Sequence, residues 1–368
     1  MREYLVVQKT YKAICLPCRF SDPSNPLQKP RAPSKVSAYE GATEVQTMEE
    51  LEELLSDPDD MKMQALLVRE RILGPAHPDT SYYIRYRGAV YADMGDFDRC
   101  IALWMYALDM QMSKLDPLSP MTQSSLLSFA ELFSFMMGTG RTRSICLVQF
   151  SDIYSIFSKA ITELERGRVV LMDTETRPSE RDFQNYSKIV TIIMHLMSLI
   201  CRLSSKLAED EEFQFKKLVY KLIKLEPRNA SGQTLLHLAA NQETTSVGKY
   251  PVCDFPCINC IELLTELDAA IDCVDLNGNT ALHVASMQKV PNADIMLSLL
   301  KAGAHIDTVN GEDKEAMDYL VTRKKALVSA IMPQNFTSLQ CLAAKAVRKY
   351  KIRYRSLPRD LQLFTDKH

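Results

Sequence analysis

Apolar residues recur at every third or fourth position over most of the chain, as on one face of an α-helix. Glycine, proline or clusters of charge interrupt this pattern and mark the expected helix ends. The pattern predicts helices over 47–55, 61–73, 118–137, 153–164, 182–206 and 211–225, and two more within 83–108. Only 12 of the 368 residues are glycine, which also favours helices over sheets with many turns. We therefore expect an all-α fold.

The segment 83–108 has the residue order of a tetratricopeptide repeat. Its two amphipathic helices meet at Gly95-Asp96, and Gly88 is small enough for close contact between them. The side chains expected to fill the shared core are Tyr91, Phe97, Trp104 and Ala107. Because one such hairpin cannot bury its apolar face alone, the helices that follow are expected to extend the array.

A second repeat type begins after Pro227. The motif Gly-x-Thr-x-Leu-His-x-Ala occurs at 232–239 and again at 278–285, and it opens an ankyrin repeat. We expect His237 and His283 to be structural residues that, with the threonines, tie each turn to the following helix by hydrogen bonds. A third, degenerate repeat after Asp307 lacks the motif and is expected to cap the stack.

The two motifs lie 46 positions apart rather than about 33, and the excess falls within 242–256. A loop of this length suggests a special role or a capping contact. Cys253, Cys257 and Cys260 follow, and with His237 they could be imagined as a zinc site. Their spacing suits no common zinc site, and 257–267 fits the second helix of the repeat, so a structural interpretation is favoured.

Near the end of the chain, 337–347 predicts a short helix with a narrow apolar face. Such a helix, rich in small residues, suits insertion into a partner's groove. It resembles the elongin-binding box of suppressor-of-cytokine-signalling and von Hippel–Lindau type adaptors, in which Ser or Thr precedes Leu. The residues that this resemblance assigns to the elongin face are Leu339, Cys341, Leu342, Ala343 and Val347.

The stretch 357–364 resembles the cullin box that accompanies such a helix, with Leu357, Pro358 and Leu361 as its cullin-facing residues. The alternative is an ordinary pair of terminal helices that caps the ankyrin stack. The basic residues between 348 and 355 are interpreted as a solvated face, because stacking residues typical of nucleic-acid binding are not interleaved elsewhere.

Composition narrows the remaining possibilities. Hydrophobic residues make up 46% and the formal net charge is −2, so no overall field favours nucleic acid or an anionic membrane. The most apolar window, 189–203, is too short and too polar to span a bilayer. Ten dispersed cysteines suggest reduced thiols and hence the cytosol or nucleus. We find no phosphate loop, no nucleophile elbow, no zinc-protease motif and no histidine at metal-ligand spacing, so we predict no enzyme activity, cofactor or metal.

From about residue 44 to the end, the chain resembles the feminization (Fem-1) family. The stretches that carry the resemblance are 57–59, 72–110, 247–253 and 338–345. The resemblance implies a substrate receptor of a cullin–RING ubiquitin ligase, with elongin B–C, a cullin and protein substrates as partners. The family also carries an N-terminal ankyrin block that recognises C-terminal degrons; residues 1–44 lack its motif, so no degron-pocket residue can be assigned here.

The expected architecture is a helical-repeat solenoid in five parts. These are a disordered N-terminus at 1–44, tetratricopeptide-like hairpins at 45–168, a linker with a helical pair at 169–227, ankyrin repeats at 228–325 and the elongin/cullin-type box at 326–368. The expected function is a non-catalytic receptor or adaptor subunit that presents substrates for ubiquitination. The alternative is a repeat scaffold or a decoy isoform that binds partners without delivering degron substrates.

Overall fold

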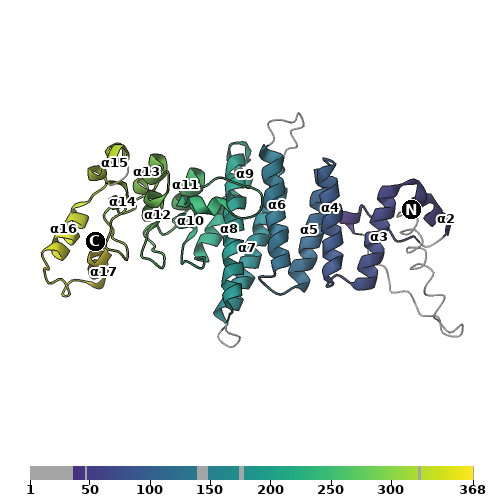
Figure 1. Ribbon diagram of the computed structural model, residues 1–368, viewed down its shortest axis with the longest axis horizontal. Helices are drawn as coiled ribbons and strands as arrows, with labels where there is room; N and C mark the ends of the chain where they lie inside the picture. Colours follow the sequence, from purple (N-terminus) through teal and green to yellow (C-terminus); the bar gives the residue numbers. More distant parts are fainter. Residues whose placement is uncertain (1–35, 46–47, 139–147, 174–177, 322–324, 368) are drawn as a thin grey trace. The chain divides into compact units, whose positions relative to one another are not determined.

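A computed structural model describes residues 36–45, 48–138, 148–173, 178–321 and 325–367. Within these ranges the protein is built from helices, and the only β-type pairing is one antiparallel bridge between Val309 and Glu315. The predicted all-α, helical-repeat fold is therefore confirmed (Figure 1). The chain divides into two compact units, one ending at Ser125 and one beginning at Leu126.

The first unit contains short helices followed by a helical hairpin. Its elements are η2 (Ser37–Tyr39), α2 (Met48–Glu53), η3 (Leu54–Ser56), α3 (Pro58–Leu73), α4 (Pro78–Asp93), α5 (Phe97–Lys114) and the start of α6 (Pro120–Gly138). α4 and α5 pack along one another, and Gly95 in the turn between them has a positive φ of 83°. The predicted pair of helices that meet at Gly95-Asp96 is therefore confirmed.

Gly88 is the point of closest approach between α4 and α5. A Cβ at this position would lie 2.4 Å from Cδ1 of Trp104. The indole is held in place because its Nε1 donates a hydrogen bond of 2.8 Å to the carbonyl oxygen of Arg85. The tryptophan therefore cannot move aside without losing that bond, and the hairpin requires glycine here.

We expect Gly88→Ala to lower the free energy of unfolding of the first unit by about 2 kcal/mol, because overpacking a rigid contact forces the helices apart. Chemical denaturation followed by circular dichroism would measure the loss. Gly138→Ala is the matched control, since Gly138 also lies in a helix but has no atom within 4 Å of the added methyl group. Equal midpoints for Gly88→Ala and wild type would contradict this account of the hairpin.

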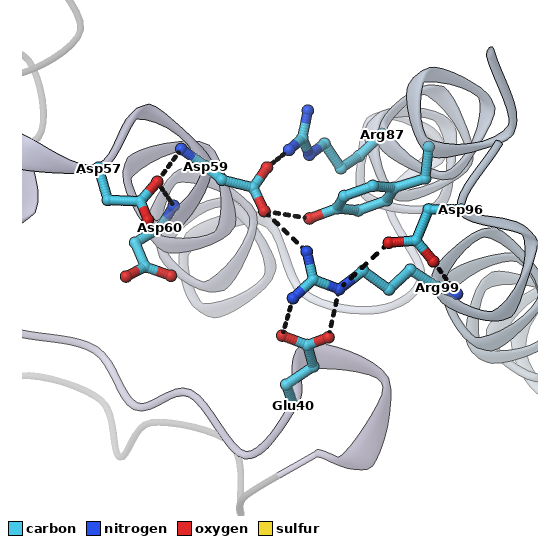
Figure 2. A network of polar contacts seen from close by, with 8 residues as sticks. Glu40, Asp57, Asp59, Asp60, Arg87, Asp96 and Arg99 are labelled. Atoms are coloured by element: carbon cyan, nitrogen blue, oxygen red, sulfur yellow. Dashed lines mark hydrogen bonds and ion pairs between the residues drawn. The ribbon is translucent and has the colours of Figure 1, made fainter. Parts of the chain in front are cut away.

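A polar network centred on Asp59 joins α3 to the hairpin (Figure 2). The Asp59 carboxylate pairs with Arg87, accepts a hydrogen bond of 2.7 Å from the hydroxyl of Tyr91, and lies 3.2 Å from Nη1 of Arg99. Arg99 in turn makes a two-point contact with Glu40 at 2.5 and 2.9 Å. These bonds hold the segment that precedes α2 against the start of α5, so that three elements share one cluster of charge.

The prediction of disorder for 1–44 needs a correction. Residues 1–35 lie outside the described part of the chain, but 36–44 pack onto α3 and α5. Tyr39 is fully buried, and its hydroxyl donates a hydrogen bond of 2.7 Å to Glu70. Glu44 is buried in an ion pair with Arg71 at 2.7 Å. One buried aromatic side chain and two ion pairs, from Glu40 and Glu44, hold this segment, and such short contacts leave no periodic pattern in the sequence.

The second unit continues α6 and adds a helical scaffold, ankyrin repeats and terminal helices. The scaffold and repeat elements are α7 (Phe150–Met172), α8 (Glu180–Leu203), η4 (Ser204–Lys206), α9 (Glu209–Lys224), α10 (Leu235–Ala240), η5 (Gln242–Thr245), α11 (Ile258–Glu266), α12 (Ala281–Met287) and α13 (Ala293–Lys301). The terminal elements are α14 (Asp318–Val321), α15 (Lys325–Ile331), η6 (Pro333–Asn335), α16 (Leu339–Lys349) and α17 (Arg359–Lys367). α7 runs unbroken across residue 168, where a domain boundary was expected, because its buried stripe continues to Gly167.

α8 is the central buried helix of this unit. It is long and apolar enough to cross a membrane by length and composition, but 67% of its most apolar window is buried inside the protein. It packs along α7 and contacts both α10 and α11. Its apolar surface is therefore used for internal packing, as expected for a core helix.

The ankyrin histidines are structural, as predicted. In the first repeat, the backbone N–H of Thr234 donates to Nδ1 of His237 at 3.2 Å, and Nε2 of His237 donates to the carbonyl oxygen of Asn279 at 2.8 Å. The second repeat has the same arrangement: Nε2 of His283 donates to the carbonyl oxygen of Lys314 at 3.0 Å. Each histidine thus links its own turn to the next repeat. Burial is the main cause that lowers the pKa of both side chains.

The insert at 242–256 packs against α6 and α8. Ser134 on α6 donates a hydrogen bond of 2.6 Å to the carbonyl oxygen of Val252, and Nε2 of His195 on α8 donates one of 2.8 Å to the carbonyl oxygen of Thr244. Gly248 lies so close to Leu127 that a Cβ would come within 2.9 Å. The expected capping contact therefore exists, and its target is α6 and α8.

The structure does not gather His237 and the three nearby cysteines into a metal site. His237 is bonded within the repeat, the thiol of Cys253 faces the carbonyl oxygen of His195 at 3.6 Å, and the thiol of Cys257 lies 3.5 Å from Oγ of Ser198. Cys260 is fully buried on α11. The structural interpretation of these residues is the one that their contacts support.

Candidate partner-binding face on the C-terminal helices

A defined turn and cap begin helix α16. Met332 adopts a positive φ of 50°, which ends the preceding helical turn and lets η6 redirect the chain. Ser338 then caps α16, because its hydroxyl accepts a hydrogen bond of 3.1 Å from the backbone N–H of Cys341. The cap therefore lies one residue before the apolar stripe, the helix starts at Leu339, the first residue of that stripe, and its rotation is fixed from its first turn.

An apolar stripe on α16 faces solvent. Leu339 is 85% exposed and Leu342 is 51% exposed. Ala343 is also exposed and Val347 is half-buried. Residues 339, 343 and 347 lie on one side of the helix, since four residues advance about 40° past a full turn. Four of the five residues predicted for the elongin face therefore form one stripe, in which Leu339, Leu342 and Ala343 are exposed and Val347 is half-buried.

Cys341 is the exception among the predicted face residues. It is only 1% exposed and lies on the opposite side of α16 with Ala344. Its position in the helix, two residues after Leu339, turns its side chain about 200° away from the stripe. The assignment of Cys341 to the elongin face is therefore corrected: it anchors the helix to the ankyrin repeats instead.

The predicted cullin-box residues also lie at the surface. Leu357, Pro358 and Leu361 are exposed around the start of α17, and Gln362 holds the turn because its side-chain nitrogen donates to the carbonyl oxygen of Leu357 at 2.6 Å. Leu363 and Ile352 are exposed to 52% and 53% as well, although neither residue was predicted from the sequence to face a partner. Ile352 follows the end of α16, so it belongs to no helical stripe. Helical periodicity therefore does not reveal that it is exposed.

Ion pairs join α16 to the third ankyrin repeat. Lys345 pairs with Glu315, and Nη2 of Arg348 lies 3.4 Å from the carboxylate of Asp313. The Tyr354 hydroxyl donates to the Asp366 carboxylate, and this bond raises the pKa of Tyr354. The ion pairs are exposed, so each contributes little to stability, but together they fix which side of α16 faces outward.

Comparison with known proteins agrees with this repeat architecture. An ankyrin repeat family model matches residues 277–311, which include the second ankyrin motif. The chain is 48% identical to the Fem-1 homolog A of Danio rerio over 344 residues, which cover 93% of this chain and 54% of that protein. It is 46% identical to the human Fem-1 homolog C over 354 residues, covering 95% of this chain and 55% of that protein. The chain belongs to the Fem-1 family.

This Fem-1 chain spans about half the length of the curated relatives it matches. The Fem-1 homolog C of Xenopus laevis is 45% identical over 371 residues, which cover all of this chain and 58% of that protein. The matched part includes the ankyrin repeats and the C-terminal helices. The candidate site lies within this matched part, and it is an exposed apolar stripe on α16.

Proposed function

We propose that this chain is a non-catalytic substrate-recognition or adaptor subunit of a cullin–RING ubiquitin ligase. α16 would insert its exposed stripe into a groove on elongin C within elongin B–C. The observation that supports this proposal is the exposure of Leu339 and Leu342 on a helix whose opposite side is buried. A soluble protein seldom leaves such a stripe uncovered unless another protein covers it.

The stripe has the composition of a groove-binding helix. Two leucines supply apolar area, and burial of each stabilises the complex by about 1.5–3 kcal/mol. Ala343 lies between them and Val347, so the helix backbone could approach a partner closely at that point. Apolar residues spaced at i, i+3 and i+4, as Leu339, Leu342 and Ala343 are, are typical of a helix that binds in a groove.

The experiment that tests this function is co-expression of the chain with elongins B and C, followed by affinity purification and size-exclusion chromatography. We expect the three proteins to co-elute as one stable complex. A folded chain that elutes alone would overturn the proposal and leave α16 as a capping helix of the ankyrin stack.

The second half of the proposal assigns α17 to the cullin. We expect Leu361→Asp to prevent recruitment of the cullin while elongin B–C still co-purifies, because Leu361 lies on a different helix from the elongin stripe. Pull-down of the elongin complex with purified cullin would measure the effect, and Leu276→Asp on an ankyrin turn is the control. If the Leu361→Asp variant recruits the cullin as well as wild type does, α17 does not contact the cullin through Leu361.

Substrates would be proteins held by the tetratricopeptide-like hairpin and the ankyrin repeats. Repeats of this kind present stacked helices and turns as an extended binding surface. The chemistry of ubiquitin transfer would belong to partner enzymes.

A further inference from the structure

A histidine, an aspartate and a cysteine converge beneath α16. Their ligand atoms, one each from His305, Asp307 and Cys341, all lie within 4.8 Å of one another. Cys341 is on the buried face of α16, whereas the other two residues lie in the segment that follows α13, at the junction of the second and third ankyrin repeats. Among the residues that the structure describes, this is the one group of three such side chains with metal-binding proximity.

The distances within the group suit a tetrahedral zinc ion. Nδ1 of His305 lies 3.3 Å from Sγ of Cys341. Zinc bonds of about 2.3 Å to sulfur and about 2.0 Å to nitrogen place two such ligands about 3.5 Å apart. Small side-chain rotations would bring the Asp307 carboxylate, which is buried, to the same centre. Sulfur, nitrogen and carboxylate oxygen together match the ligand preferences of zinc better than those of calcium or magnesium.

The surroundings also suit a bound metal. Asp272 lies on the other side of the His305 ring: its Oδ2 is 3.8 Å from Nε2, and its Oδ1 accepts a hydrogen bond of 3.1 Å from the backbone N–H of His305. A carboxylate behind a metal-binding histidine fixes the orientation of the ring and makes the other nitrogen a better ligand. The Ser338 hydroxyl donates to the Cys341 sulfur at 2.9 Å, which holds this sulfur in place beside His305.

We propose that His305, Asp307 and Cys341 form a zinc site that fastens α16 to the ankyrin repeats. The three ligands leave a fourth position for water or a further donor, as in open zinc sites. Because Cys341 points away from Leu339, metal binding would leave the exposed stripe free while holding the helix that carries it. No spacing along the sequence indicates this group, because Cys341 lies 36 residues after His305. The site does not depend on the proposed ligase function.

The test is titration of the metal-stripped full-length chain with Zn²⁺ and, separately, with Co²⁺. We expect tight zinc binding, as well as a cobalt spectrum with a thiolate charge-transfer band and the visible bands of tetrahedral coordination. Cys341→Ser should weaken zinc binding by more than about 100-fold and remove the thiolate band, and Asp272→Asn should weaken binding by about ten-fold. Cys273→Ser and Cys260→Ser are the matched controls and should bind as wild type does.

Three results would overturn the proposal. The first is a folded wild-type chain that binds neither metal. The second is binding that Cys341→Ser and Asp307→Asn leave unchanged. The third is loss of the thiolate band in Cys260→Ser but not in Cys341→Ser, which would place the metal among the cysteines of α11. Because the cobalt spectrum of the wild type is itself diagnostic, the test remains decisive even if one variant folds poorly.

Discussion

Leu339→Asp is expected to abolish capture of elongin B–C while the chain remains folded. The side chain is the most exposed member of the α16 stripe, so its replacement removes no internal contact. In a complex, the same position would carry a buried, unpaired carboxylate in place of an apolar anchor. The loss should exceed about 100-fold in affinity, equivalent to about 3 kcal/mol. Biolayer interferometry with purified elongin B–C would measure it.

The matched control for this variant is Leu276→Asp. Leu276 is also a strongly exposed leucine, but it lies in the turn of the second ankyrin repeat, outside the terminal helices. The control should bind elongin B–C as wild type does. If Leu339→Asp binds with unchanged affinity and has the same melting temperature as wild type, the α16 stripe is not the elongin-binding face.

Acidification is expected to destabilise the fold, and His195 is expected to be one cause. The ring is fully buried on α8, and burial is the main cause that lowers its pKa to about 4. Nε2 donates to the carbonyl oxygen of Thr244, so the neutral ring carries its proton there. In the described part of the chain no group forms a hydrogen bond with the buried Nδ1. Protonation would therefore create a buried cation with an unsatisfied donor.

Because the folded-state pKa lies below the unfolded value of about 6.5, the unfolded chain binds more protons between these two pH values. Stability is therefore fully present above pH 6.5 and is lost as the pH falls toward 4. His195 alone should lower the free energy of unfolding by about 2 kcal/mol between pH 7 and pH 5. Urea denaturation at the two pH values, compared between wild type and His195→Gln, would measure this contribution.

Glutamine is the suitable replacement because its side-chain amide can still donate to the carbonyl oxygen of Thr244. The variant should lose less stability on acidification than wild type does. His237 and His283 also have lowered pKa values and act in the same direction, so the variant retains part of the acid sensitivity. Identical pH dependence of the two proteins would rule out His195 as a source of the effect.

Local sequence patterns predicted most of the helices because each carries its own stripe and its own end signals. The α4–α5 hairpin and the α10 and α12 repeats follow directly from glycine, threonine and histidine positions that have one structural role. The apolar stripe on α16 was predictable for the same reason. Three of its residues recur at four-residue intervals, so a single helix brings them to one side.

Contacts between distant segments were not predictable from these patterns. The inward orientation of Cys341 depends on where α16 packs, and the packing surface is set by His305, in another repeat. The order of 36–44 depends on Glu70 and Arg71, which belong to α3. The course of the insert depends on Ser134 and His195 on two separate helices. Such contacts follow from tertiary geometry, which one-dimensional periodicity does not contain.

The insert in the first ankyrin repeat changes how mechanical load passes through the second unit. In a simple repeat array each module touches only its neighbours, so modules can fray one at a time from an end. Here the bonds from Ser134 to Val252 and from His195 to Thr244 bridge separations of 118 and 49 residues. A force applied to the first ankyrin repeat would therefore act directly on α6 and α8. The repeat and these two helices should then unfold in one step rather than one after the other.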